Sequence, residues 1–287
     1  MKKQKVDYFG KNAELLKNKK LFLFDMDGTI YNEDSIFNGT LDLLTEIKMN
    51  GGRYVFITNN SSKSVNDYVN KVTRLGIEAD VENFFTSAQA TVLYLKEKFP
   101  EGLVYCQGTK SLIRGLKESG IRVTESVTDE AEVVLVGFDT ELTTEKVYHT
   151  CEMLQKNIPF LATNPDLACP VSFGFVPDCG SICKMFEDAT GKRPIYIGKP
   201  EAMMVNIVRE KFHCCAEETV VIGDRLYTDI ATGLNAGVDA ICVLTGEATV
   251  QDIIGGKIKP TYTFKSVKEI YKALQKEKVG FFQEGVI

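Results

Sequence analysis

The sequence is poor in the residue types that several kinds of functional site require. Its 287 residues include no tryptophan and two histidines, His149 and His213. A metal cage built from several imidazoles, or a Ser-His-Asp triad, therefore has few ways to form. We expect any chemistry at this protein's site to use carboxylates.

Long apolar runs and positive net charge are also missing. No apolar stretch reaches the ~18 residues of a membrane-spanning helix, and no apolar segment follows the basic residues 1–20 as it would in a signal peptide. The net charge of −5 disfavours binding to a nucleic-acid backbone. The eight cysteines are interpreted as free thiols. We therefore expect a cytoplasmic protein with neither nucleic acid nor membrane as partner.

Short apolar runs alternate with amphipathic helix-length segments in two parts of the chain. This alternation is typical of βαβ units, in which buried parallel strands are joined by crossover helices. The predicted strands are residues 21–24, 54–58, 195–198, 219–224 and 240–246, and the predicted helices lie near residues 39–49, 64–75, 201–212, 228–236 and 266–277.

Residues 84–187 repeat the same alternation and are numerous enough to bury a core of their own. The sequence therefore predicts an α/β fold with two parts. A Rossmann-like, doubly wound parallel sheet comprises residues 1–83 and 188–287, and an α/β domain, residues 84–187, is inserted into it. The last segment, residues 275–287, is weakly patterned, and we expect it to be only partly ordered.

Polar side chains follow four of the predicted core strands. Ligands bind at the carboxyl ends of strands in open α/β sheets, so one crevice would collect these groups. Several carboxylates in one crevice are unfavourable without cations, and oxygen ligands of this kind suit Mg²⁺. A metal ion and a lysine beside a carboxylate suit phosphoryl transfer. The residues concerned are Asp25, Asp27, Thr58, Asn59, Asn60, Lys199, Asp224 and Asp229.

These strand ends resemble the four motifs of a known family. "DMDGT", "TNN", "GKP" and "GDRLYTD", in this order, look like the motifs of the haloacid dehalogenase-like hydrolases. The large insertion between the second and third motifs resembles the type-2 cap of the NagD-like phosphatases, and the resemblance spans roughly residues 20–265. Four motifs in order are far harder to meet by chance than any one alone.

The resemblance implies a catalytic role for each matching residue. Asp25 would attack phosphorus and form an aspartyl-phosphate, and Asp27 would protonate the leaving oxygen and then deprotonate the attacking water. Thr58 and Asn59 would bind phosphate oxygens. Lys199 would neutralise both the phosphate and Asp25.

The resemblance also implies a metal site. Mg²⁺ would be bound by Asp25, by the main-chain carbonyl of Asp27 and by Asp224, while Asp229 would orient the Asp224 loop or a metal-bound water. The expected activity is Mg²⁺-dependent hydrolysis of a small phosphomonoester such as a sugar phosphate, a nucleotide or phosphoglycolate. We leave open a homo-oligomer formed through the cap.

The inserted domain would close the site. Its "ATNPD" segment places Asn164 and Asp166 at a strand end, and in the family a similar loop approaches the substrate. Asp178 departs from the family pattern, because relatives often have a small residue or glycine there. Cys179 and Cys183 lack the C-x₂-C spacing of a zinc site and are interpreted as ordinary thiols.

Two other functions remain open from the sequence. One is a non-catalytic module that binds a phosphorylated metabolite, although all four motifs retain their charged residues. The other is a phosphotransferase, since an aspartyl-phosphate does not dictate which acceptor resolves it. A dinucleotide-binding site is excluded, because neither G-x-G-x-x-G nor G-x-x-x-x-G-K-[ST] follows a strand.

Overall fold

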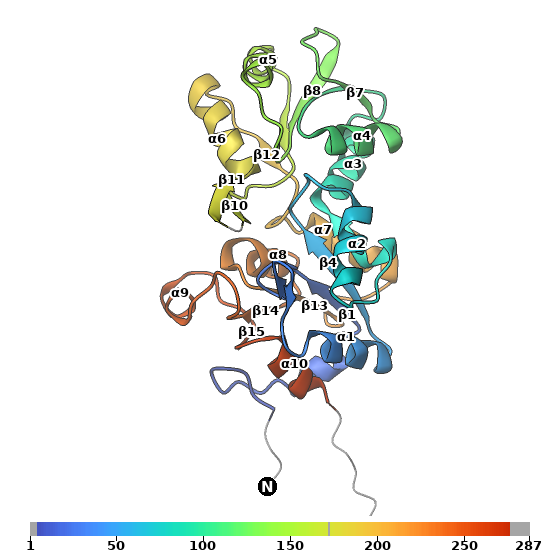
Figure 1. The fold of residues 1–287 in the computed structure, drawn as a ribbon, viewed down its shortest axis with the longest axis vertical. Coiled ribbons are helices and arrows are strands. Elements are labelled where there is room, and N and C mark those ends of the chain that lie inside the picture. The colour runs from blue at the N-terminus through green and yellow to red at the C-terminus, as the bar shows by residue number, and fades with distance from the viewer. Residues whose placement is uncertain (1–4, 172, 276–287) are drawn as a thin grey trace, which may run out of the picture.

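The computed structural model describes residues 5–171 and 173–275. They form two α/β parts stacked along the long axis of the molecule (Figure 1). Apart from Gln275, the segment expected to be partly ordered lies outside the described residues. The described residues contain no helix long and apolar enough to cross a membrane.

The larger part, called the core, contains a six-stranded parallel sheet in the order β15-β14-β13-β1-β4-β5. The predicted doubly wound parallel sheet is thereby confirmed. Its strands are β1 (Leu21–Phe24), β4 (Arg53–Thr58), β5 (Phe84–Thr86), β13 (Thr219–Gly223), β14 (Asp239–Val243) and β15 (Tyr262–Phe264). The core helices are α1 (Thr40–Met49), α2 (Val65–Arg74), α7 (Met203–Phe212), α8 (Ala231–Asn235), α9 (Val250–Gly255) and α10 (Val267–Leu274).

The central strand β1 shows why the core sheet is covered on both faces. All four of its residues are buried, and successive side chains of a strand point to opposite faces. Phe22 and Phe24 belong to a cluster with residues of α1 and α10, whereas Leu21 and Leu23 pack with residues of α7. Two apolar layers therefore hold β1 at the centre of the sheet and fix the position of the residue that follows it.

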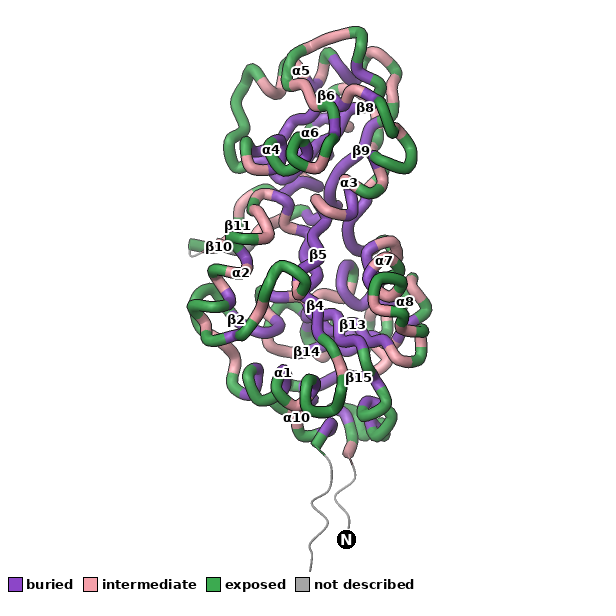
Figure 2. Tube along the Cα trace, turned by 90° about the vertical axis from the view of Figure 1, so that its right-hand side faces the viewer, coloured by how far each residue is buried: buried purple, intermediate pink, exposed green. Residues whose placement is uncertain are grey.

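The smaller part, called the cap, has a parallel sheet of its own in the order β12-β9-β8-β6-β7. Figure 2 shows that buried positions run along the strands of both sheets. The cap strands are β6 (Leu103–Gln107), β7 (Arg122–Thr124), β8 (Ala131–Val136), β9 (Phe160–Ala162) and β12 (Ile195–Tyr196). The cap helices are α3 (Ser87–Lys98), α4 (Lys110–Glu118), α5 (Thr144–Gln155) and α6 (Cys179–Thr190).

The hydrogen bonding of two short strands corrects the sequence prediction. Residues 195–198 were expected to form a core strand, but β12 pairs with β9 of the cap. Conversely, β5 lies beyond the predicted boundary at residue 83 and pairs with β4 of the core. The strands of the cap sheet therefore run from β6 to β12, which places residues 195–196 in the cap sheet and residues 84–86 in the core sheet. Strands of two or three residues carry too little periodicity to reveal their sheet.

Two antiparallel hairpins were not expected from the sequence, and both flank the site described below. One joins β2 (Tyr31–Asn32) to β3 (Ser35–Ile36) directly after the first motif. The other joins β10 (Ala168–Val171) to β11 (Gly174–Pro177) and extends from the cap toward the core. Residues of both hairpins line the cavity between the two parts.

Candidate active site

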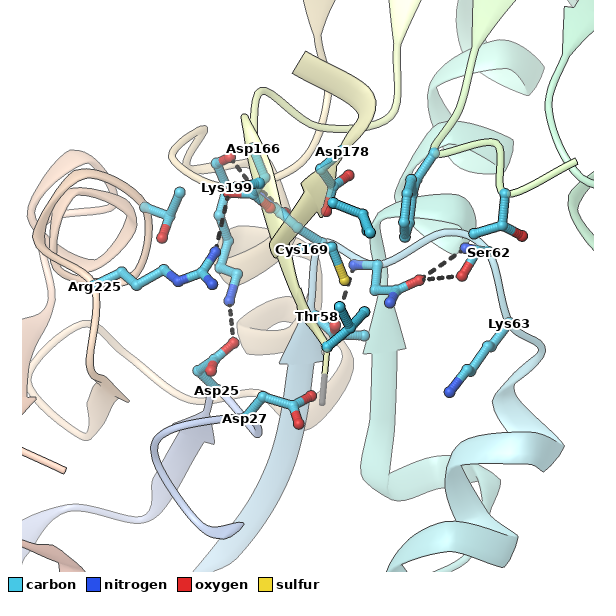
Figure 3. Close-up of a pocket in the computed structure, with 18 of the residues that line it drawn as sticks. Asp25, Asp27, Thr58, Ser62, Lys63, Asp166, Cys169, Asp178, Lys199 and Arg225 are labelled. Atoms are coloured by element: carbon cyan, nitrogen blue, oxygen red, sulfur yellow. Dashed lines mark hydrogen bonds and ion pairs between the residues drawn. The ribbon is translucent and has the colours of Figure 1, made fainter. Parts of the chain in front are cut away.

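Side chains predicted at four strand ends meet at one edge of the core sheet, and Figure 3 shows Asp25, Thr58 and Lys199 among them. Asp25 follows β1, Thr58 is the last residue of β4, and Asp224 follows β13. Lys199 comes from the segment between β12 and α7, and its Nζ reaches Asp25. The parallel sheet thus gathers residues that are far apart in the sequence, as expected for the carboxyl edge of such a sheet.

Both the side chain and the backbone of Lys199 form contacts that fix its position. Its Nζ lies 2.6 Å from Asp25 Oδ1 and 2.6 Å from Asp229 Oδ1, and it donates to the carbonyl oxygen of Ile57 at 3.2 Å. Asn59 Oδ1 accepts from the backbone N–H of Lys199 at 2.7 Å, and Asn59 Nδ2 donates to its carbonyl oxygen at 2.9 Å. The amide of Asn59, predicted to bind phosphate, therefore fixes the lysine.

Three carboxylates surround this single lysine. Oxygens of Asp25, Asp224 and Asp229 all lie within 4.8 Å of one another. Burial, together with the Asp229 carboxylate, raises the pKa of Asp25 well above its usual range and that of Asp224 to about 6. Burial alone would lower the pKa of Lys199, but Asp229 and Asp25 outweigh it and raise that pKa.

The charge of this cluster fits a divalent cation. Three carboxylates and one ammonium leave two negative charges uncompensated when all are ionised. The donors are carboxylate oxygens, and Mg²⁺ and Ca²⁺ prefer oxygen ligands to softer ligands such as thiolates. Because the cluster is buried, its excess negative charge is energetically costly, and the pKa values of Asp25 and Asp224 are raised as a result. A divalent metal would cancel it.

The carboxylate of Asp224 lies so close to two backbone segments that only glycine fits at the nearest position of each. The N–H of Glu247 donates to Asp224 Oδ2 at 2.7 Å, and Thr29 Oγ1 donates to Oδ1 at 3.3 Å. A Cβ at Gly246 would lie 2.0 Å from Oδ2, and one at Gly28, whose φ is +81°, would lie 2.6 Å from it. Both glycines are therefore required by the position of this carboxylate.

Asp27 lies apart from the buried cluster, with its side chain 50% exposed. Tyr31 Oη donates to Asp27 Oδ2 at 3.3 Å, and Lys71 Nζ lies 3.5 Å from Oδ1 and 3.9 Å from the centre of the Tyr31 ring. The sequence prediction missed both neighbours. No signal identified them, since Lys71 looks like any solvated lysine of α2 and Tyr31 like a core residue.

Thr58 and Asn60 of the second motif have different structural roles. Thr58 is buried, and its Oγ1 accepts from the N–H of Asn60 at 3.2 Å. Asn60 Oδ1 accepts from the N–H and Oγ of Ser62, at 2.9 and 2.7 Å. Asn60 therefore shapes the turn that leads to α2, which leaves Thr58 as the hydroxyl at the strand end.

A cavity of about 330 Å³ separates the core site from the cap. The motif residues Asp25, Asp27, Thr58, Asn59, Lys199 and Asp229 line it from the core side. Both hairpins and the segment that precedes α6 complete its wall. The volume suits a small molecule. Residues contributed from outside the core motifs include Glu33, Lys63, Lys71, Phe138, Asp166, Cys169, Val176 and Asp178.

Asn164 and Asp166 have different places in the cap. Asp166 lines the cavity, whereas Asn164 is fully buried, and its Nδ2 lies 3.2 Å from both Asp166 Oδ2 and Asp178 Oδ1. Arg225, whose role the sequence left undecided, joins core to cap: its Nη1 lies 3.8 Å from Asp166 Oδ1 and its Nε 3.1 Å from Glu247 Oε2.

The cysteines form no metal site in the described part of the chain. Cys179 and Cys183 are buried with their sulfurs 4.0 Å apart, and burial raises the pKa of Cys169 to about 11. The described residues contain one cluster of three or more potential metal ligands, the carboxylates already described. None of the eight cysteines, all of which lie in the described residues, forms a disulfide bond.

Two family models match the chain on either side of the cap. A haloacid dehalogenase-like hydrolase model matches residues 22–122, and a HAD-hydrolase-like model matches residues 196–270. An acid sugar phosphatase of Staphylococcus saprophyticus is 32% identical over 261 residues, which are 91% of this chain and 100% of that protein. The likeness therefore includes the cap as well as the core.

Solved structures share the same architecture. A 4-nitrophenylphosphatase from Thermotoga maritima is 38% identical with a TM-score of 0.86, over 91% of this chain and 99% of that one. NagD from E. coli K-12 is 30% identical with a TM-score of 0.79, over 88% and 98%. A glycerol phosphate phosphatase from Mycobacterium tuberculosis, in complex with magnesium, is 26% identical with a TM-score of 0.84, over 91% and 78%. The chain belongs to the haloacid dehalogenase-like hydrolases, and within them to the NagD-like phosphatases.

Proposed function

We propose that this protein is a Mg²⁺-dependent phosphatase that hydrolyses small phosphomonoesters through an aspartyl-phosphate on Asp25. The observation that carries the proposal is the Asp25 carboxylate itself. It lies at the floor of the cavity, 2.6 Å from Lys199 Nζ and within a cluster of three carboxylates. The names of the acid sugar phosphatase, the 4-nitrophenylphosphatase and the glycerol phosphate phosphatase support the same class of reaction.

Two displacements at phosphorus make up the reaction. A carboxylate oxygen of Asp25 attacks phosphorus, and the bond to the ester oxygen breaks while that oxygen takes a proton from Asp27. Asp27 then accepts a proton from water, whose oxygen attacks phosphorus and releases phosphate and free Asp25. Asp27 lines the cavity and its side chain is half exposed, so its carboxyl group would be accessible to a leaving group bound there.

The surrounding residues hold charge in place during both steps. Lys199 offsets the charge of Asp25 and of a phosphate bound beside it, and Thr58 Oγ1 offers a hydrogen bond to a phosphate oxygen. Asn59 keeps the lysine backbone fixed. Asp25, Asp224 and the carbonyl of Asp27 would hold Mg²⁺, with Asp229 beside them. The metal would neutralise negative charge on the phosphoryl group.

The test is hydrolysis of p-nitrophenyl phosphate and of a panel of phosphorylated metabolites, with Mg²⁺ or with EDTA. We expect EDTA to abolish turnover and Asp25→Asn to lower kcat by about 10⁴-fold or more, because the nucleophile is lost. Asp42→Asn, an exposed carboxylate on α1, is the matched control and should keep full activity.

Other outcomes would favour the alternative functions. Turnover that persists in Asp25→Asn, or that ignores EDTA, would overturn the mechanism. Tight binding of one ester without turnover would favour a binding module, and phosphoryl transfer to an added alcohol faster than to water would favour a transferase. The expected cytoplasmic location and association through the cap stay predictions.

A further inference from the structure

Two carboxylates on the cap side of the cavity take no part in the proposed hydrolysis. Asp166 follows β9 and Asp178 precedes α6, and Figure 3 shows both on the opposite side of the cavity from Asp25 and Asp27. Asn164 Nδ2 lies 3.2 Å from an oxygen of each. Its own Oδ1 accepts from Thr163 at 2.9 Å, which fixes the orientation of the amide. The carboxylate pair is therefore held in place from behind.

One oxygen of this pair lacks a hydrogen-bond donor. The Asp166 side chain is 7% exposed, and within the described part of the chain its Oδ1 accepts no hydrogen bond. Arg225 Nη1, at 3.8 Å, is an ion-pair partner beyond hydrogen-bond distance. A buried polar atom without a partner is costly, so a donor from a bound molecule would be favourable there.

The charges that line the cavity are also unequal. Six carboxylates face four cationic side chains. Lys199 is already paired with Asp25 and Asp229, and Lys71 with Asp27. Arg225 is shared between Glu247 and Asp166, and the fourth cation, Lys63, is an exposed residue. A leaving group that adds a negative charge near the cap carboxylates would be repelled, whereas a positive charge would be attracted.

We infer that the enzyme selects phosphate esters whose leaving alcohol carries an amine, with the ammonium group bound between Asp166 and Asp178. This inference rests on the proposed phosphatase function and adds the substrate class to it. The phosphate would lie at Asp25 and Lys199, and the amine would point toward the cap. A hydroxyl in the same position would donate a hydrogen bond but bring no charge. A carboxylate there would be rejected.

The test uses four esters that differ in a single group: 2-aminoethyl phosphate, 2-hydroxyethyl phosphate, ethyl phosphate and phosphoglycolate. We expect kcat/KM to fall in that order, with at least about a 100-fold difference between the amine and the carboxylate. Equal values for all four, or a preference for phosphoglycolate, would overturn the inference.

Single substitutions test which residues are responsible. Asp166→Asn and Asp178→Asn should each lower the ratio of kcat/KM for aminoethyl phosphate to that for ethyl phosphate by about tenfold, because one charge is removed without a change of shape. Asp188→Asn, an exposed carboxylate on α6, is the control and should leave the ratio unchanged. The ratio is measured within one preparation, so a variant that folds incompletely still gives a valid result.

The two hypotheses fail in different ways. If no ester in the series and not even p-nitrophenyl phosphate is hydrolysed, the proposed function is wrong. If p-nitrophenyl phosphate is hydrolysed but the amine gives no advantage, or if the Asp166 and Asp178 variants keep the wild-type ratio, the selection for amines is wrong and the phosphatase function stands.

Discussion

The carboxyl ends of the core strands and of the cap strands carry similar polar residues but balance their charges differently. In the cap, Asp139 follows β8, and its Oδ2 accepts from Gln107 Nε2 at 2.7 Å and from Lys146 Nζ at 2.8 Å. In the core, Lys199 forms ion pairs with Asp25 and Asp229, and a third carboxylate, Asp224, lies beside these two.

Both sheets are parallel and wound in both directions, so topology alone would nominate either edge as a site. At the end of cap strand β8, the buried carboxylate of Asp139 has a lysine of its own, and its charge is balanced. At the core edge, three carboxylates face one lysine, and the remaining negative charge requires a divalent cation. The excess of buried negative charge, more than the topology of the sheet, therefore distinguishes the core edge around Asp25 from the end of cap strand β8.

The largest expected contrast comes from removing the lysine of each edge. Lys199→Met should lower kcat for p-nitrophenyl phosphate by about 10³-fold, because the fixed positive charge beside Asp25 is lost. Lys146→Met should instead lower the free energy of unfolding by about 3 kcal/mol, because Asp139 loses its cation, and should change kcat less than about twofold. An equal loss of kcat in both variants, measured at saturating substrate, would break the comparison.

A second contrast concerns pH in the absence of metal. Burial and Asp229 raise the pKa of Asp224 to about 6, and burial raises that of Asp178 in the cap to about 6. The folded state then binds protons more tightly than the unfolded state, so stability should fall as pH rises from about 4 to about 6. Each group contributes up to about 3 kcal/mol. Thermal unfolding in EDTA at several pH values measures the trend.

Metal should separate the two contributions to this pH dependence. Mg²⁺ bound to Asp224 would restore stability at neutral pH, whereas the contribution of Asp178 would persist. Asp224→Asn should therefore reduce the part that Mg²⁺ relieves, to which Asp25 also contributes, and Asp178→Asn should abolish the part that Mg²⁺ does not relieve. If the two substitutions behave alike, the metal does not bind where we place it.

Two close glycine contacts give a smaller contrast. In the core, Gly246→Ala forces Asp224 to move, so kcat/KM should fall by about 10- to 100-fold and more Mg²⁺ should be needed for half-maximal activity. In the cap, a Cβ at Gly180 would lie 2.1 Å from the carbonyl oxygen of Pro165. Gly180→Ala should reduce stability but leave the Mg²⁺ requirement unchanged. A titration of Mg²⁺ in both variants decides.

The smallest expected effect is a gain. Gly115 lies within α4, and a Cβ built there meets no atom within 4 Å. Gly115→Ala should raise the free energy of unfolding by about 0.5 to 1 kcal/mol, because alanine loses less backbone entropy in a helix. Urea unfolding measures it, and a loss of stability would show that α4 tolerates no side chain there.

The sequence was sufficient to predict the charged residues of the core site. Strands β1, β4 and β13 are continuous apolar runs because they are buried on both faces, and such runs are recognisable without a structure. The polar residue that ends each run then lies at the edge of the sheet. Asp25, Thr58 and Asp224 follow from this reasoning, and their matched order identified the family.

Contacts between elements were harder to predict. Tyr31 and Lys71 flank Asp27 across a hairpin and a helix, and Arg225 reaches the cap, but none of these side chains is marked by spacing or composition. The burial of Asn164 behind the cavity wall likewise depends on how α6 packs against β9. Such features depend on tertiary packing, which local sequence patterns do not encode.

The pairing of β12 with the cap sheet limits how this protein can be recombined with its relatives. Tyr196, the last residue of β12, pairs with Ala162 in the cap sheet, and Lys199 follows three positions later in the carboxylate cluster. An exchanged cap must therefore supply its own edge strand and deliver the lysine at the same spacing. A graft cut at residues 84 and 187 would remove β9, the strand with which β12 pairs, so the cap cannot be exchanged at these boundaries without a replacement partner for β12.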